Sequence, residues 1–134
     1  SSIQNLALRI IGSIIGGGDD NQVQSIINCG CLPVLNRLLD NHPTVEIKQE
    51  ICWTLSNITS RSQQQIQAVL DEVIDSLIWY MKYETEFYVQ REAVWAVANT
   101  TINASPKQIA TLAKKGCIQL LCVFLSNQSN LLLS

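Results

Sequence analysis

Apolar side chains recur every three or four residues along most of this chain, with polar residues between them. That spacing follows the helical period of about 3.6 rather than the strand period of 2, so the sequence predicts helices and no sheet. Short helices are expected at 32–39, 74–81 and 118–125, and longer ones at 3–15 and around 50–57 and 92–99. Another helix should precede each of the three short ones, and these preceding helices should end at Cys29-Gly30, Glu72-Val73 and Lys115-Gly116.

Two segments of the chain are near copies of each other. They read Glu50-Ile-Cys-Trp-Thr-Leu-Ser-Asn57 and Glu92-Ala-Val-Trp-Ala-Val-Ala-Asn99, and they lie 42 residues apart. Val23, Ile66 and Ile109 begin another set of equivalent segments, spaced by 43 residues. A fixed period in this range is typical of stacked repeats. The sequence therefore predicts an all-α array of three-helix units.

The period also divides the chain. Residues 1–17 would form the third helix of one repeat, 18–61 and 62–104 two whole repeats, and 105–134 the first two helices of a further repeat. We expect residues 1–134 to form a single array and, from this phasing, a fragment of a longer one. Both ends would then expose apolar faces, along 3–15 and 118–133, which should promote self-association.

Each copied segment carries a polar stripe beside its apolar one. Positions i, i+3 and i+7 share one helix face, which groups Glu50 with Trp53 and Asn57, and Glu92 with Trp95 and Asn99. The aliphatic residues fall on another face, which should be the core side: Ile47, Ile51, Leu55 and Ile58 in one copy, and Val89, Ala93 and Val97 in the other. We interpret the repeated Trp–Asn stripe as a binding surface. The alternative is that the indoles pack against the next repeat and the amides only satisfy helix ends.

An exposed asparagine ladder suits an extended peptide. One Asn amide can pair with both the N–H and the C=O of a peptide residue. Helices pack about 8–10 Å apart and an extended chain advances about 3.3 Å per residue, so neighbouring rungs would hold residues about three apart. Between the indoles, the stem of a lysine or arginine could stack while its charged head meets Glu50 or Glu92.

Composition narrows the function classes. The chain is 47% apolar and 15% charged, with a net charge of −2, which argues against direct binding of nucleic acid. We see no membrane-spanning segment and no signal peptide, and we expect a cytoplasmic or nuclear domain. The five cysteines match no metal pattern and are expected to be small buried residues in a reducing compartment.

No residue set supports catalysis. His42 is the only histidine, and no nucleophile and base stand at a recognised catalytic spacing. Gly16-Gly17-Gly18 lacks the Lys-Ser/Thr that follows the glycines of a phosphate-binding loop. We therefore predict that the protein is not an enzyme and needs neither a cofactor nor a metal.

The strings Cys-Trp-Thr-Leu-Ser-Asn-Ile-Thr (52–59) and Glu-Ala-Val-Trp-Ala-Val-Ala-Asn-Thr-Thr (92–101) resemble armadillo repeats of the importin α family, and the likeness covers nearly all of the chain. The resemblance implies a right-handed superhelical solenoid. It also implies a nuclear import adaptor, found in cytoplasm and nucleus, that binds cargo bearing lysine- or arginine-rich nuclear localisation signals. An Arg-bearing repeat before two Trp-bearing repeats implies the minor signal-binding site. The positions matching the family's peptide contacts are Arg9, Asp19, Glu50, Trp53, Ser56, Asn57, Glu92, Trp95 and Asn99.

The chain departs from the family pattern in places. Ser13 stands where the first ladder Asn is expected, so one backbone clamp would be shorter or absent. The turns after the ladder, Ser60-Arg61 and Ile102-Asn103, are expected to put a bulky or charged group near the groove rim. The arm that binds importin β in the family is absent from this sequence. The alternative function is an armadillo scaffold for another extended partner, as in catenin-like arrays, or a groove that no longer binds localisation signals. Catenin-like grooves are dominated by basic residues, for which this chain offers only Arg9 and Arg91.

Overall fold

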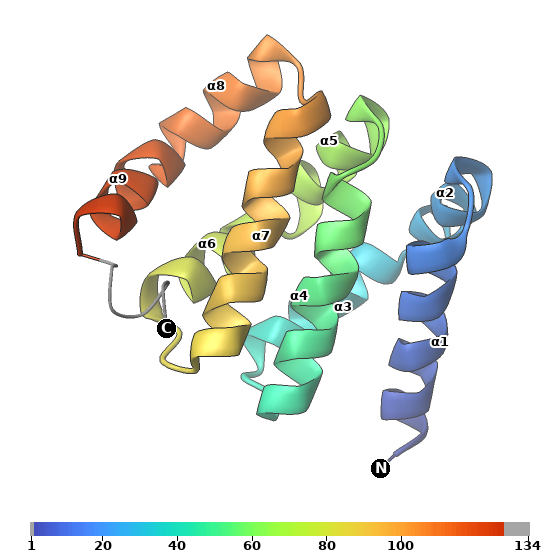
Figure 1. Ribbon diagram of the computed structural model, residues 1–134. Coiled ribbons are helices and arrows are strands. Elements are labelled where there is room, and N and C mark those ends of the chain that lie inside the picture. The colour runs from blue at the N-terminus through green and yellow to red at the C-terminus, as the bar shows by residue number, and fades with distance from the viewer. Residues whose placement is uncertain (1, 128–134) are drawn as a thin grey trace.

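The computed structural model describes residues 2–127, and within that range the chain forms helices and no strands (Figure 1). The helices are α1 (Ile3–Gly17), α2 (Asp20–Asn28), α3 (Cys31–Asp40), α4 (Val45–Thr59), α5 (Gln63–Glu72), α6 (Ile74–Tyr83), α7 (Phe87–Asn103), α8 (Pro106–Lys114) and α9 (Cys117–Asn127). Their order repeats two shorter helices followed by a long one. The predicted all-α stack of three-helix units is confirmed.

Helix ends follow from local sequence. Asp19 and Ser105 each cap a helix with their side chains, and a glutamine three residues later bonds back to the capping residue's N–H. Gly30 and Gly116 have φ of 88° and 89°, the left-handed region that glycine adopts without strain. At the third equivalent break Val73 has φ −140°, so α5 and α6 meet without a left-handed residue.

The long helices α1, α4 and α7 lie side by side on one face of the stack (Figure 1). The predicted core stripe of α4 is confirmed, since Ile51, Leu55 and Ile58 are fully buried. In α7 the predicted residues Val89 and Ala93 are likewise buried. The same packing leaves the opposite stripe of each long helix on the surface.

Polar side chains join successive units at the repeat spacing. The amide of Gln65 donates to the carbonyl oxygen of Asp20 at 3.1 Å, and the equivalent Gln108 donates to that of Gln63 at 2.8 Å. Across the α4–α7 contact, the hydroxyl of Thr59 donates to the carbonyl of Ala96 at 2.6 Å. Each of these bonds satisfies a polar group at a junction that excludes most water.

A salt bridge holds α4 to the turn before α7. Lys48 Nζ lies 3.0 Å from Glu84 Oε2, and both side chains are largely buried. Burial raises the pKa of Glu84, but the N–H groups of Glu86 and Thr85 together with Lys48 outweigh it, so its pKa is lowered overall.

The expectation that all five cysteines are buried is wrong. Cys52 and Cys117 are buried and Cys31 partly so, but Cys29 and Cys122 are exposed. Cys29 follows the last turn of α2 beside an open apolar hollow, and Cys122 lies on the outer side of α9. Burial of a small residue in a stack depends on whether another helix lies over it, which composition does not record.

The two ends of the array carry exposed apolar side chains, as predicted for 3–15. Ile3, Leu6 and Ile10 are exposed on α1, and Ile118 and Val123 on α9. The part of the predicted apolar end beyond residue 127 lies outside the described residues. Within residues 2–127 no single helix is long and apolar enough to cross a membrane, and only α8 and α9 taken together, bent by 70°, reach that length and composition.

Candidate functional site

The stripe carrying the tryptophans lies on the surface formed by α1, α4 and α7. Trp53 is 40% exposed and Trp95 50% exposed, so the prediction that both indoles lie outside the core is confirmed. Partly exposed tryptophans are common at binding surfaces, because the indole offers a flat apolar face and one N–H donor.

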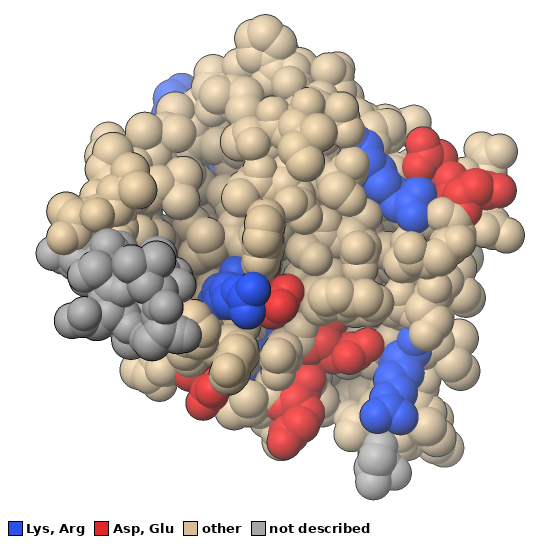
Figure 2. Space-filling view, in the orientation of Figure 1, with Lys and Arg blue, Asp and Glu red and all other residues tan. Residues whose placement is uncertain are grey.

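An open hollow of about 580 Å³ lies at this surface. It is lined by Arg9, Ser13, Glu46, Gln49, Glu50, Trp53 and Glu92, which come from α1, α4 and α7. Five predicted site residues are thus brought together. On the face shown in Figure 2, which is largely uncharged, acidic groups gather over the N-terminal halves of α4 and α7. Three carboxylates and one guanidinium line the hollow, which gives it an acidic balance.

Glu46 and Gln49 were missing from the predicted set. With Glu50 and Trp53 they stand at i, i+3, i+4 and i+7 of α4, which places all four on one side of the helix. The helical period could have identified both, because the predicted stripe simply extends one turn toward the start of the helix.

Trp53 lies over two glycines of α1. A Cβ added at Gly16 would lie 3.3 Å from Trp53 Cη2, and one added at Gly12 would lie 3.4 Å from Trp53 Cζ3 and 3.1 Å from Glu50 Oε1. The indole therefore packs on the neighbouring unit through its six-membered ring and remains partly exposed. Packing and exposure, which the sequence offered as alternatives, occur together at this residue.

The ladder amides differ in their bonding. Asn99 Nδ2 donates to the carbonyl oxygen of Ser56 at 3.0 Å, which leaves its second N–H and its Oδ1 for other partners. Ser56 is buried, and its hydroxyl donates to the carbonyl of Trp53 at 2.6 Å. Asn57 Nδ2 is buried and has no hydrogen-bond partner among the described residues. An unpaired amide of this kind costs free energy until a ligand or water accepts from it.

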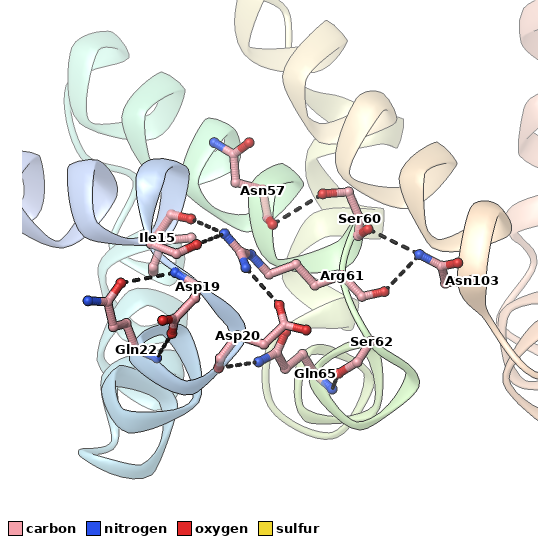
Figure 3. Close-up of polar contacts among 11 residues, drawn as sticks. Ile15, Asp19, Asp20, Gln22, Asn57, Ser60, Arg61, Ser62, Gln65 and Asn103 are labelled. Atoms are coloured by element: carbon pink, nitrogen blue, oxygen red, sulfur yellow. Dashed lines mark hydrogen bonds and ion pairs between the residues drawn. The ribbon is translucent and has the colours of Figure 1, made fainter.

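Asp19 and Arg61 lie at the C-terminal end of α1. Asp19 Oδ1 accepts from the N–H of Gln22 at 2.8 Å, so this carboxylate caps α2. Arg61 donates to the carbonyls of Ile15 at 2.8 Å and Gly18 at 2.7 Å, and pairs with Asp20 at 2.8 Å (Figure 3). These bonds hold the charge of Arg61, which this turn was expected to bring to the groove rim, against the end of α1 and the start of α2. Its guanidinium reaches a helix end rich in unpaired carbonyls, a favourable place for a cation.

Asn103 repeats the same arrangement one unit later. Its amide donates to the carbonyls of Ser60 at 3.2 Å and Arg61 at 3.0 Å, just beyond the end of α4 (Figure 3). The side chains that follow each ladder asparagine thus reach back to the preceding unit.

The electrostatics of the hollow favour a cation. Burial raises the pKa of Glu92, while nearby Arg91 lowers it in part. A partly desolvated carboxylate attracts a positive group more strongly than a fully hydrated one. Within residues 2–127 no group of three or more His, Cys, Asp or Glu side chains could hold a metal ion.

Comparison with known proteins gives a consistent result. Residues 19–60 and 62–102 match the Armadillo/beta-catenin-like repeat. Importin subunit alpha-8 of Arabidopsis thaliana is 38% identical over 116 residues, which cover 87% of this chain and 26% of that protein. Importin subunit alpha-3 of the same plant is 44% identical over 121 residues, which cover 90% of this chain and 22% of that protein. The chain thus spans about a quarter of these relatives.

A designed armadillo repeat protein, solved in complex with the peptide (KR)4, has a similar structure. Its TM-score is 0.83 and its sequence identity 32%, over 93% of this chain and 51% of the designed one.

Proposed function

Because this chain belongs to the armadillo/beta-catenin-like repeat family, we propose that its groove binds lysine- or arginine-rich segments in extended conformation. Such segments include nuclear localisation signals, and the chain would serve as part of a nuclear import adaptor that moves between cytoplasm and nucleus. The curated relatives named above, which are importin α subunits, support this assignment. Any contact with importin β would be made by a segment outside this sequence.

The observation that carries the proposal is the acidic hollow beside Trp53. The methylenes of a lysine or arginine would pack on the exposed indole, and the charged head would lie near Glu50 and Glu92. Arg9 lines the same hollow and would repel a second cation placed close to it. The hollow therefore suits one basic side chain, with Trp95 offering a second exposed indole on α7.

The ladder amides would hold the peptide backbone. Asn57 has an unpaired N–H group that would donate to a peptide carbonyl after the amide turns outward from its buried position, and Asn99 keeps one N–H beyond its bond to Ser56. Ser13, on α1, offers one donor on a short side chain, where the amide of an asparagine would offer two donors and a separate acceptor. We therefore expect two strong rungs and one weak one, with Asp19 acting through its cap of α2 rather than as a direct contact.

A fluorescence and calorimetry series would test the proposal. Trp79 lies on α6 against His42, with ring centroids 4.9 Å apart, so Trp79→Phe removes its signal and leaves the two groove indoles. Titration with a lysine- and arginine-rich octapeptide should change that fluorescence. An acidic octapeptide of equal length should not.

Asn57→Ala and Asn99→Ala should each weaken binding by about 1–2 kcal/mol, or about five- to thirtyfold, through the loss of one or two hydrogen bonds. Trp53→Ala should cost as much or more, because stacking area and cation–π attraction are lost together. Unchanged affinity in both Asn variants would show that the ladder is structural. Preference for the acidic peptide would instead support the catenin-like alternative.

A further inference from the structure

The guanidinium of Arg61 is surrounded by acceptors in the way a bound cation would be. Nη2 donates to the carbonyl oxygens of Ile15 at 2.8 Å and Gly18 at 2.7 Å, and Nη1 pairs with Asp20 at 2.8 Å (Figure 3). The two carbonyls lie at the C-terminal end of α1, where the helix dipole favours positive charge. The Arg61 side chain is only 16% exposed, so its charged head fills the site that these three acceptors form.

The acceptors of this cation site belong to other elements than Arg61 itself. They come from the last turn of α1, the residue after that helix and the first turn of α2, whereas Arg61 follows the end of α4. Two of the three are main-chain carbonyls, which remain whatever side chain stands at position 61. A guanidinium or ammonium group from another molecule could therefore bind there if Arg61 were absent. The site lies at a junction between two units of the described chain, so it does not depend on what precedes α1.

The cation site adjoins the groove. Gly16, the neighbour of Ile15, lies against the groove residues of α4: an added Cβ would be 3.3 Å from Trp53 Cη2 and 3.8 Å from Asn57 Nδ2. Asn57 also stands one turn before Arg61 along the chain (Figure 3). The indole, the unpaired amide and the cation site thus lie next to one another between α1 and α4.

The next unit shows that a contact between units at this place needs no charge. Asn103 stands one repeat after Arg61, and its neutral amide donates to the carbonyls of Ser60 at 3.2 Å and Arg61 at 3.0 Å. The place of Asp20, directly after the N-cap of the following helix, is taken there by the uncharged Gln63. A positive side chain is therefore found at the junction that offers a carboxylate, and a neutral one at the junction that does not.

We propose that this site is a cation subsite of the peptide groove and that Arg61 fills it from within the chain. Arg61 is then a specificity-determining residue. A bound segment needs no lysine or arginine at the position beside the end of α1, because a basic side chain there finds its acceptors already taken. The basic residue in the acidic hollow beside Trp53 is still required. This inference rests on the function proposed above, since it takes the ligand to be an extended basic peptide.

Calorimetry with a lysine- and arginine-rich octapeptide, and with versions in which each basic residue in turn is replaced by alanine, provides the test. In Arg61→Ala the cation site is open. One peptide position that tolerates alanine with the parent protein should then become sensitive, with a loss of affinity of about tenfold. Asn103→Ala is the matched control, because it removes the equivalent contact at a place without a carboxylate, and it should create no newly sensitive position.

The parent protein separates this inference from the proposed function. If the parent binds the octapeptide and Arg61→Ala weakens every peptide equally, with no newly sensitive position, Arg61 is a structural contact only and the subsite is refuted while the proposed function stands. Binding by Arg61→Ala but not by the parent would support the subsite. Binding by neither would refute the proposed function together with the assignment of this site to the groove.

Thermal unfolding with a small cation tests the site without a peptide. Ethylguanidinium chloride, compared with sodium chloride at the same concentration, should raise the melting temperature of Arg61→Ala and not that of the parent or of Asn103→Ala. If Arg61→Ala does not fold, Arg61→Met keeps most of the stem, and guanidinium itself should raise its melting temperature relative to that of Asn103→Ala. An equal response of all variants would refute the cation site.

Discussion

Replacement of Arg61 by methionine should loosen α1 from the rest of the stack. The guanidinium of Arg61 donates to the carbonyls of Ile15, in the last turn of α1, and of Gly18, just after that helix, and it pairs with Asp20. Methionine keeps most of the side chain's apolar stem and removes all of these bonds. The perturbation therefore separates the polar contacts of Arg61 from its packing.

The expected cost can be worked from these contacts. The Arg61 side chain is only 16% exposed, but that of Asp20 is 64% exposed, so the ion pair itself is worth at most about 1 kcal/mol. A hydrogen bond from a charged donor contributes about 1.5–3 kcal/mol, and water can partly replace it at these carbonyls. We expect a total loss of about 2–4 kcal/mol. Arg61→Lys should lose less stability than Arg61→Met, because it keeps the charge but not the paired N–H donors of the guanidinium. Asp20→Asn should lose less than about 1 kcal/mol of stability.

Urea unfolding would measure the total loss, and hydrogen exchange would locate it. Amides of α1 should lose protection in Arg61→Met, while those of α7, which contacts neither Arg61 acceptor, should keep theirs. If Asp20→Asn proved as costly as Arg61→Met, the ion pair rather than the carbonyl bonds would dominate. Equal loss of protection in α1 and α7 would refute the local account.

Three further predictions concern other contacts. The affinity for a basic peptide should decrease as the pH is lowered through the raised pKa of Glu92, because the peptide binds the ionised carboxylate. In Glu92→Gln, calorimetry should show an affinity that depends less on pH. Lys48→Met should lower stability by about 1–3 kcal/mol near neutral pH. Because the pKa of Glu84 is lowered, melts below about pH 4 should show that difference shrinking as Glu84 protonates. In urea denaturation, Gly12→Ala should lower the free energy of unfolding by about 1–3 kcal/mol, because the added methyl group would crowd α4. Gly17→Ala, with open space around it, should raise the free energy of unfolding by up to about 1 kcal/mol.

The helices and the core could be predicted because they depend on local spacing. The buried residues Ile51 and Leu55 follow a period that any amphipathic helix must show. The direction of Arg61 could not be predicted in this way, because its acceptors lie more than forty positions earlier in the chain. Likewise, nothing near Cys29 or Cys122 in the sequence states whether a helix from another unit covers it.

Within the candidate site, Glu50, Trp53 and Glu92 of the predicted stripes line one hollow, since stacking places equivalent helices in parallel. The matched positions Arg9 and Ser13 line it as well, whereas Asn57, Trp95 and Asn99 do not. The hydrogen bonds of the two ladder asparagines could not be predicted from the sequence. Asn57 and Asn99 occupy equivalent positions, yet only Asn99 donates to the preceding unit.

The bonds between units have a consequence for how this protein can change over evolutionary time. Gln65, Asn99 and Gln108 all donate to main-chain carbonyls of an earlier unit. A carbonyl is present whatever side chain its residue carries, so the accepting positions can drift freely without breaking the junction. The donors have no such latitude, because only a side chain of suitable length and chemistry can reach. For these three bonds, mutational tolerance should therefore be one-sided, strict at the donor in the later unit and permissive at the acceptor in the earlier one.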